Sequence, residues 1–262
     1  MASLPDQPQR ICVLVAHPDD EALWFGGSLL QLRDNGAEII IACATHGRDR
    51  VRAAEFKKLC ATLNGVGILM DFPDGGGRRK LPDFTHELDQ RLADLSMRPA
   101  ELGLVITHAP HGNERGHSDH IYCYRHARRW AARHGVAFSF ASERRLTQLE
   151  PALRQDRAPR AVRPSAQWLS GLIQSSIANA RDGGVRVSLR HEVRLICDLL
   201  PVKAVVANQV DVAAKQRLLE EVYVSQIDGL RQYAAFQSDM EYLYFHQMDA
   251  AHAFWRSSWP SS

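Results

Sequence analysis

Residues 11–21 read ICVLVAHPDDE, and this stretch decides the class of fold. Its first six residues form a short apolar run rich in β-branched side chains, which is typical of a parallel strand covered by helices on both faces. Polar residues follow at once, and apolar side chains then recur with helical spacing over residues 21–35, up to the helix-ending pair Asn35-Gly36. The stretch therefore predicts a strand, a polar loop and a helix.

The same alternation continues along the chain. Apolar runs predict strands at residues 38–44, 68–70 and 102–107, and amphipathic segments predict helices at residues 52–63 and 83–96. Strands that alternate with helices are joined by right-handed crossovers and pair in parallel. We therefore expect an α/β fold with a doubly wound, mostly parallel, Rossmann-like sheet flanked by helices and followed by C-terminal elaborations.

The rest of the chain gives weaker patterns. Helical spacing predicts helices at residues 121–134 and 211–233, while residues 185–189 and 203–207 are candidate strands. Residues 150–166 hold three prolines and four arginines, so we expect an extended surface segment or flap there. These segments would add to the sheet and cover its edge.

We treat residues 1–262 as a single domain because the sequence has no internal repeat or low-complexity tract. Residues 1–149 would form the core, and residues 150–262 would supply the flap and the C-terminal elements. With 45% hydrophobic and 24% charged residues, the chain has the balance of a globular protein with one substantial core. This balance excludes a disordered chain and a disulfide-stapled miniprotein.

Charge and cysteine content narrow the setting. Lys and Arg number 32 against 30 Asp and Glu, a balance too even for a nucleic-acid partner. The five cysteines form no C-x-x-C pair, which favours a reducing, cytoplasmic location. The N-terminal residues MASLPDQPQR lack the apolar segment of a signal peptide, and no later run of about 18 apolar residues predicts a membrane span.

The first group of chemically active residues follows the first predicted strand. His17, Asp19 and Asp20 lie at its carboxyl end, where doubly wound sheets place their sites. One carboxylate and the imidazole can bind a cation, while the second carboxylate lies beside the metal-bound water. The alternative is that Asp19 and Asp20 form an N-cap pair for the following helix.

The second group is His117-Ser118-Asp119-His120, which follows the strand predicted at residues 102–107. If it opens the next helix, its two histidines stand at positions i and i+3 on one face. One histidine can then bind a metal while the other faces a substrate. The alternative is that both are ordinary loop histidines.

Together the two groups resemble the PIG-L/LmbE family of zinc-dependent N-deacetylases, whose signatures are an A-H-P-D-D-E block after the first strand and a later H-x-D-H block. Here they are residues 16–21 and 117–120, with Ser118 at a position where family members often have proline. Further matches to the family are Thr45-His-Gly, Arg52 with Glu55, Asp71-Phe-Pro-Asp74-Gly and Tyr223-x-Ser-Gln226. The resemblance thus spans most of the chain.

The resemblance implies a metal site made by His17, Asp20 and His120, with one coordination position left open for water. The expected ion is Zn²⁺, although a set of two histidines and a carboxylate also suits Fe²⁺. Asp19 would be the general base. These assignments make the first group and the second group two parts of one centre.

The resemblance implies further roles around that centre. When protonated, His117 would stabilise the tetrahedral oxyanion and pass a proton to the leaving amine, and Asp119 would orient an imidazole. Arg52 and Asp74 match positions that hold sugar hydroxyls in the family. The alternative for Arg52 is a surface ion pair with Glu55.

Other polar and aromatic residues near these groups are expected to be structural. We expect His46, His108 and His111 to be structural or solvated, and Trp24 to belong to the core. Glu21 would support the loop from behind the metal.

The function implied by the resemblance is hydrolysis of an N-acetyl or other N-acyl group on an amino sugar or its glycoconjugate, giving a free amine and acetate. The expected partner is a small N-acetylated sugar, and the oligomeric state is not predicted. Two alternatives are a metal-dependent hydrolase of another amide or ester, and a non-catalytic zinc or carbohydrate-binding module. Substrate specificity would lie in the loops at residues 74–82 and 108–116 and in residues 150–166.

Overall fold

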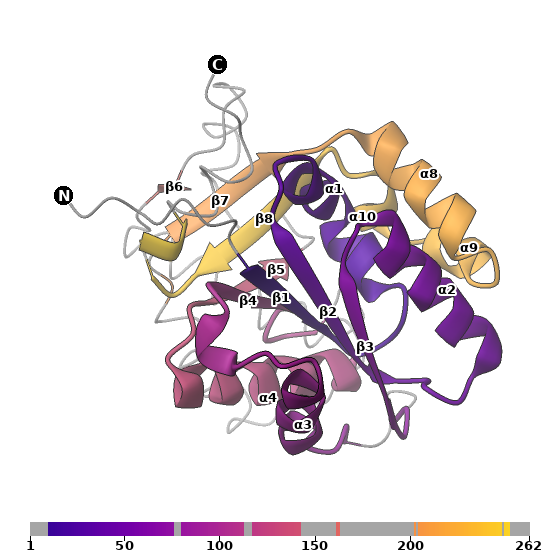
Figure 1. Ribbon diagram of the computed structural model, residues 1–262. Coiled ribbons are helices and arrows are strands. Elements are labelled where there is room, and N and C mark those ends of the chain that lie inside the picture. The colour runs from indigo at the N-terminus through magenta and orange to yellow at the C-terminus, as the bar shows by residue number, and fades with distance from the viewer. Residues whose placement is uncertain are drawn as a thin grey trace, which may run out of the picture.

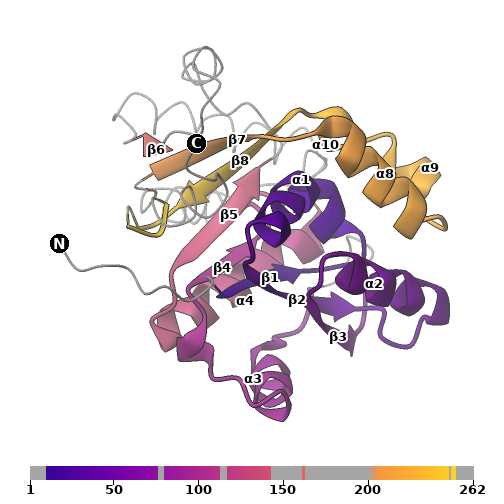
Figure 2. The same cartoon turned by 45° about the horizontal axis from the view of Figure 1, so that its top comes forward.

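The structure, a computed structural model, describes residues 10–75, 80–112, 117–142, 161–162, 202, 204–247 and 249–251. Within these ranges the strands form one eight-stranded sheet in the order β3-β2-β1-β4-β5-β8-β7-β6. Helices cover both of its faces (Figures 1 and 2). The expected α/β architecture is confirmed.

The first five strands pair in parallel. They are β1 (Arg10–Val15), β2 (Glu38–Thr45), β3 (Val66–Phe72), β4 (Leu104–Thr107) and β5 (Phe138–Ser142). The chain runs outward from β1 through β2 to β3 and then returns to place β4 on the other side of β1. The carboxyl ends of β1 and β4 therefore flank the point where the strand order reverses, which is where open α/β sheets bind ligands.

The other edge of the sheet is antiparallel. It consists of β8 (Met240–Phe245), β7 (Ala204–Gln209) and β6 (Ala161–Val162). The strand expected at residues 203–207 is thus present as β7, and β5 and β8 are additional to the predicted strands. Because the antiparallel strands lie together at one edge, the mostly parallel sheet remains the correct description.

The helices divide between the two faces of the sheet (Figure 1). On one face lie α1 (Asp20–Asp34), α2 (Arg50–Thr62) and α8 (Val212–Val222), which pack together. On the other face lie α3 (Thr85–Asp94) and α4 (Ser118–His134), and the short 3₁₀ helix η1 (Pro99–Glu101) precedes β4. The short helices α9 (Ile227–Leu230) and α10 (Ala234–Gln237) continue the layer of α8.

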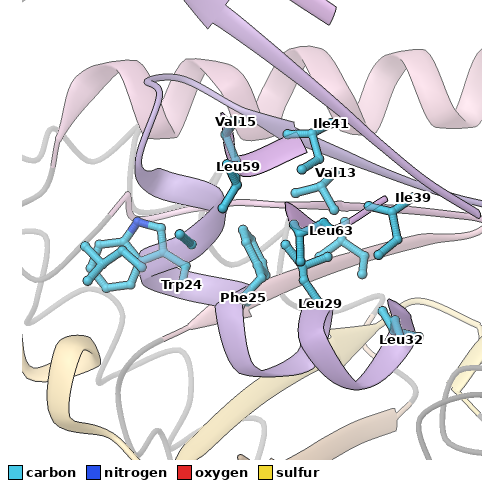
Figure 3. Packing of buried hydrophobic residues seen from close by; sticks show 14 of the residues in the cluster. Val13, Val15, Trp24, Phe25, Leu29, Leu32, Ile39, Ile41, Leu59 and Leu63 are labelled. Atoms are coloured by element: carbon cyan, nitrogen blue, oxygen red, sulfur yellow. The ribbon is translucent and has the colours of Figure 1, made fainter. Parts of the chain in front are cut away.

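Alternating side chains of β1 fill the two apolar layers. Val13 and Val15 pack into the layer under α1, while Cys12 and Leu14 pack into the layer under α4. The first layer is shown in Figure 3, where Phe25 of α1 lies close to the strand residues. A strand that is apolar on both faces needs helices on both faces, which explains why the sequence of β1 decides the fold.

The predicted helix at residues 211–233 is shorter than expected, since α8 ends at Val222. The chain turns there because Tyr223 and Ser225 bind carboxylates on neighbouring helices, Glu21 of α1 and Glu55 of α2. These contacts replace the next turn of helix. The short helix α9 then begins at Ile227.

Some expectations lie outside the described residues. The candidate strand at residues 185–189 is one of them, and of residues 150–166 only 161–162 are described. In the part of the chain that is described, the helices are too short or too polar to span a membrane.

Candidate active site

Both residue groups singled out from the sequence lie at the switch point of the sheet, at the carboxyl ends of β1 and β4. Two threonines fix these strand ends. The Thr45 hydroxyl donates to the Ala16 carbonyl at 2.8 Å, and the Thr107 hydroxyl donates to the Leu14 carbonyl at 2.7 Å. The turn after β1 is therefore anchored on both sides before any functional side chain is placed.

The turn between β1 and α1 has an unusual backbone. The amide N–H of His17 donates to Asp20 Oδ2 at 2.8 Å, which closes the turn. Asp19 has a φ of 124°, in the region that favours glycine, and its side chain makes no capping hydrogen bond to α1. The N-cap alternative is therefore wrong for the Asp19 carboxylate, and the strained backbone directs that carboxylate elsewhere.

Three side chains from the two groups, each able to bind a metal ion, converge. Asp20 Oδ2 lies 3.2 Å from His17 Nδ1, and Asp20 Oδ1 lies 3.2 Å from His120 Nε2. The two imidazole nitrogens are 3.3 Å apart. Two ligands of a tetrahedral zinc ion at its usual bond lengths are separated by about 3.3 Å. The spacing of His17, Asp20 and His120 therefore fits a divalent ion of this kind.

A second donor set shares His17. It comprises His17, His117 and Asp119, whose donor atoms also lie within 4.8 Å of one another. His17 Nε2 is 3.5 Å from Asp119 Oδ2, which accepts a hydrogen bond from the Gly75 amide at 3.0 Å. Asp119 thus faces the side of the His17 ring opposite to Asp20, as expected for a residue that orients an imidazole.

His108 supports the same centre from below. Its Nε2 accepts a hydrogen bond from the Ala16 amide at 3.1 Å and lies 3.4 Å from Asp20 Oδ2. Its ring stacks on His120 with centroids 4.0 Å apart and an angle of 5° between the planes. The expectation that His108 is structural was incomplete, because it packs against two members of the first donor set.

Arg52 binds the carboxylate that the strained turn exposes. Its Nη2 donates to Asp19 Oδ2 at 2.6 Å and also to the Pro18 carbonyl. Glu55 instead accepts hydrogen bonds from the Ser225 amide and hydroxyl, each at 2.7 Å. The alternative of an Arg52–Glu55 surface ion pair is therefore wrong.

His46 joins Arg52 to Asp74. Its Nε2 lies 3.3 Å from Arg52 Nη1 and 3.3 Å from Asp74 Oδ2. Asp74 Oδ1 in turn lies 3.6 Å from His17 Nε2. Like Asp19, His46 has a positive φ, in this case 66°. The expected sugar-binding pair, Arg52 and Asp74, thus lies beside the donor set and is connected through His46.

His117 occupies the N-cap position of α4, directly before the helix begins at Ser118. Its ring stacks on that of His120, with centroids 4.6 Å apart, and meets the edge of the His17 ring at 5.0 Å. The two histidines therefore share one side of the helix start, as the i, i+3 spacing predicts. Both line the pocket described below.

The two adjacent aspartates have opposite pKa shifts. Burial and the neighbouring Asp20 raise the pKa of Asp19 well above its usual range, even though Arg52 acts against the shift. Burial would also raise the pKa of Asp20, but the imidazoles of His120 and His108 outweigh it and hold that pKa well below its usual range. Asp20 is therefore the permanent carboxylate, and Asp19 is the one with greater affinity for a proton.

The three histidines at the centre also differ. Burial lowers the pKa of His117 and of His120 to about 4, so both are neutral at pH 7. Burial would lower the pKa of His17 too, but hydrogen bonds to Asp119 and Asp20 outweigh it and raise that pKa well above its ordinary value. A metal ion that binds His17 must displace its proton, so metal affinity would depend on pH.

Behind the turn, Glu21 is fully buried and accepts a hydrogen bond from the Tyr223 hydroxyl. Burial raises the pKa of Glu21 to about 7. The second oxygen of Glu21 accepts from the Asp19 amide at 3.4 Å. Glu21 therefore supports the turn from behind, as expected, and ties it to the segment after α8.

The site contains one pocket with a volume of about 360 Å³. From the two sequence groups and their neighbours it takes the side chains His17, Asp19, Asp20, Arg52, Asp74, His117 and His120. The rest of its wall comes from α1 and from the segment after α8: Leu23, Trp24, Gln226, Gly229, Leu230, Gln232 and Tyr233. All eight residues expected to act on metal, water or sugar lie in or beside this pocket, since Asp119 contacts His17.

Sequence reasoning did not single out the wall formed by Gly229, Leu230, Gln232 and Tyr233. No chemical signature marks these residues, and they reach the pocket only because the chain turns after Val222. Trp24 was expected in the core, and it is 8% exposed there. It also lines the pocket and donates from Nε1 to Asp20 Oδ1 at 3.3 Å.

Comparison with known proteins agrees with the geometry. Residues 12–131 match the PIG-L family model, described as GlcNAc-PI de-N-acetylase. The N-acetylglucosaminyl-phosphatidylinositol de-N-acetylase of Bos taurus is 31% identical over 133 residues, which cover 46% of this chain and 49% of the relative. The 1D-myo-inositol 2-acetamido-2-deoxy-alpha-D-glucopyranoside deacetylase of Segniliparus rotundus is 28% identical over 159 residues, with the same coverage. The chain spans about half the length of these curated relatives.

Among solved structures, the antimicrobial reagent A40926 pseudoaglycone deacetylase Dbv21 is similar with a TM-score of 0.46 and 13% sequence identity. The similarity covers 92% of this chain and 97% of that one. The family resemblance stated from the sequence is confirmed by the match over residues 12–131.

Proposed function

We propose that this chain is a metal-dependent hydrolase that removes an N-acetyl or other N-acyl group from an amino sugar or its glycoconjugate. The match of residues 12–131 to the PIG-L family model supports this proposal. The products would be a free amine and acetate. The proposal also draws on the two relatives described above, which are named as deacetylases of N-acetylated glucosamine compounds.

The observation that carries the proposal is that three side chains able to bind a metal ion converge beside a further carboxylate, that of Asp19, which does not belong to this ligand set. His17, Asp20 and His120 supply donors 3.2–3.3 Å apart, and Asp19 lies in the same pocket. Metal binding alone has no use for Asp19 or for the strained backbone that directs it. The strained backbone at Asp19 therefore has no explanation if the protein is a non-catalytic zinc-binding module.

The donor set fits Zn²⁺ and also suits Fe²⁺. The three ligand side chains are buried, and the donor atoms that they offer lie within 4.8 Å of one another. A divalent ion held there would polarise the amide carbonyl and make a water molecule acidic near neutral pH.

Asp19 is placed to take the proton of that water. Its raised pKa makes it a stronger base than an ordinary carboxylate, and a base works best when its pKa is close to the working pH. Arg52 holds Asp19 Oδ2, which leaves Oδ1 for the water. A cation bound by Asp20 would act against the raised pKa of Asp19 and keep it ionised.

His117 would act on the other side of the reaction. With a pKa of about 4 it enters as a neutral imidazole, so its first role is to donate an N–H hydrogen bond to the oxygen that gains negative charge. That developing charge raises the affinity of the ring for a proton, so the proton that Asp19 takes from the water can pass through His117 to the leaving amine. The proposed positively charged His117 is thus formed during the reaction.

Arg52 and Asp74 would hold hydroxyl groups of the sugar. Both line the pocket within reach of the donor set, and a guanidinium and a carboxylate together offer donors and acceptors to neighbouring hydroxyls. His46, which contacts both side chains, would hold them in a fixed position relative to each other. We also propose a cytoplasmic location, because the cysteines within the described residues, Cys12, Cys43, Cys60 and Cys123, are buried and free.

The test is acetate release by the zinc-loaded protein across a panel of N-acetylated amino sugars and glycoconjugates. We expect release from at least one N-acetylglucosamine derivative, with an equal amount of free amine. Esters and amides of other chemical classes belong in the same panel. Release from those alone would contradict the proposal and favour a hydrolase of another bond.

A further inference from the structure

The pocket is divided chemically, and its apolar part comes from residues with no role in the mechanism above. Leu23 and Trp24 on α1 meet Leu230 and Tyr233 from the segment after α8. The Trp24 and Tyr233 rings meet edge to face, with centroids 5.5 Å apart and an angle of 82°. The contact between the two rings joins the part of this wall on α1 to the part that follows α8.

We propose that this wall, Leu23, Trp24, Leu230 and Tyr233, binds the acyl chain of the substrate and favours acyl groups longer than acetyl. The inference rests on the proposed function, since it assigns the acyl side of the bond that is cleaved. It deepens that function by naming the part of the substrate that sets specificity.

The position of Trp24 supports the acyl side over the sugar side. Its indole N–H donates to Asp20 Oδ1, so the ring lies one hydrogen bond from a proposed metal ligand. The acyl chain begins at the carbonyl carbon itself, whereas an aglycone is separated from it by the whole sugar ring. A group that contacts Trp24 therefore lies close to the scissile carbonyl, and we assign it to the acyl chain because Arg52 and Asp74 suit the sugar hydroxyls.

The chemistry of the remaining wall agrees with this division. Arg52 and Asp74 offer charged groups that suit hydroxyls, and a hydrocarbon chain would leave them unpaired. Leu23, Trp24 and Leu230 line the pocket with side chains that are apolar apart from the Trp24 indole N–H, which is bound to Asp20. A chain of several methylene groups gains from contact with such a surface, and a methyl group uses little of it.

The wall opens to solvent at Gly229 and Gln232, which are exposed and line the pocket. A Cβ atom added to Gly229 would meet no other atom within 4 Å. A larger side chain can therefore be introduced at this position of the pocket lining without a clash in the described residues.

The experiment measures kcat/KM of the zinc-loaded protein for N-acetyl, N-butyryl, N-hexanoyl and N-octanoyl glucosamine. We expect kcat/KM to rise with chain length, by up to about fourfold per buried methylene, until the chain reaches the rim. Gly229→Leu should lower the hexanoyl-to-acetyl ratio by about tenfold or more, because it fills the path of the chain. Gly229→Ala should lower it less.

Asp228→Leu is the matched control. The Asp228 side chain is 97% exposed, lies in the same short helix and does not line the pocket. The hexanoyl-to-acetyl ratio of kcat/KM in the Asp228→Leu variant should therefore equal that of the parent. A second readout needs no turnover: binding of acetate, butyrate and hexanoate by calorimetry should strengthen with chain length in the parent and weaken in Gly229→Leu.

The outcomes separate the two proposals. If no N-acyl glucosamine is hydrolysed, the proposed function fails, and graded carboxylate binding alone then decides whether the apolar subsite exists. If acetyl is hydrolysed but the ratio is flat in parent and Gly229→Leu alike, the acyl subsite is wrong. A response of alkyl glycosides to Gly229→Leu, with none from the acyl series, would overturn it in favour of the aglycone.

Discussion

Asp19 and Asp20 are neighbours in the sequence, yet they face different surroundings. Asp20 points toward His120 and His108, whose imidazoles favour its ionised form, while Asp19 is directed by its positive φ to Arg52. Two carboxylates with pKa values pushed apart are a common way to obtain a permanent ligand and a base from one turn. Burial and the neighbouring Asp20 raise the pKa of Asp19, while the imidazoles of His120 and His108 lower the pKa of Asp20, and these different surroundings cause the separation.

The two donor sets that share His17 can be told apart by substitution. His120→Ala should lower zinc affinity by more than about 100-fold, because it removes a ligand from the set with the closer spacing. His117→Ala should bind zinc within about tenfold of the parent. Competition with a chromophoric chelator measures both. The reverse order would assign the metal to His17, His117 and Asp119 instead.

His46 should show the effect of its positive φ. His46→Ala should be less stable than His46→Gly by about 1 kcal/mol, because only glycine adopts this backbone without a steric cost. Urea denaturation of the two variants at one pH measures the difference. Both variants should also lose kcat/KM, since Arg52 and Asp74 lose the imidazole between them. An alanine variant at least as stable as the glycine variant would show that the backbone there is unstrained.

At the residue scale, the sequence was sufficient to predict the two groups and their meeting point. The spacing of His17, Asp20 and His120 could not be predicted, because it depends on the register of β1 against β4. The same holds for Arg52, which reaches Asp19 across 33 positions of the chain. The i, i+3 spacing suggested Glu55 as the partner of Arg52, but in the folded structure Glu55 accepts a hydrogen bond from Ser225.

Among the elements, α1 connects the site to the antiparallel edge of the sheet. The Glu241 carboxylate of β8 accepts hydrogen bonds from the Gly27 and Ser28 amides of α1 and pairs with buried Lys215 of α8 at 2.9 Å. Gly27 also allows α1 to lie close to Val210, because a Cβ atom on Gly27 would lie 2.3 Å from Val210 Cβ.

Gly27→Ala should therefore destabilise the protein by about 1–3 kcal/mol through overpacking. Gly26→Ala is the matched control in the same helix, since its Cβ would lie 3.5 Å from Lys215 Cγ, an ordinary contact. That variant should be neutral or more stable by up to about 1 kcal/mol through helix propensity. Thermal and urea denaturation compare them. Equal effects of the two substitutions would mean that α1 can shift away from Val210.

Glu21 joins α1 to the turn after α8 and should make stability depend on pH. Its pKa is about 7 in the folded protein and 4.5 ordinarily, so the native state binds the proton more tightly. The native state must therefore lose stability as the pH rises from 4.5 through 7. Glu21→Gln stays neutral and can still accept from Tyr223. The free energy of unfolding of Glu21→Gln should therefore exceed that of the parent by a margin that grows to about 3 kcal/mol at pH 8.

Urea unfolding of metal-free parent and Glu21→Gln at pH 5 and pH 8 measures this growth. The comparison with the parent at each pH removes the contribution of the other titrating groups. A difference that is the same at both pH values would show that Glu21 ionises normally.

At the element scale, periodicity predicted the parallel strands and their helices well. The helix at residues 211–233 was predicted too long, because its apolar spacing continues past Val222 while Tyr223 and Ser225 bond to Glu21 and Glu55. β5 and β8 were not predicted from the sequence, and they pair with each other where the parallel part of the sheet meets its antiparallel edge. Only the assembled sheet shows which short apolar runs become strands.

For the whole molecule, the strand order explains why two groups about 100 residues apart make one centre. β1 and β4 are adjacent and parallel, so the turns that follow them meet at the same edge of the sheet. The helices α1 and α4 begin within these turns and lie on opposite faces. The segment after α8 closes the pocket from the side of α1.

The most direct test of this account separates metal binding from turnover. Zinc is titrated into the metal-free parent and Asp19→Asn while released acetate is measured with an N-acetylglucosamine derivative that the parent hydrolyses. We expect both proteins to bind one zinc ion with similar affinity, and turnover by Asp19→Asn to be lower by about 10²- to 10⁴-fold, as for the loss of one acid–base group. Full activity of Asp19→Asn with zinc bound would contradict the account.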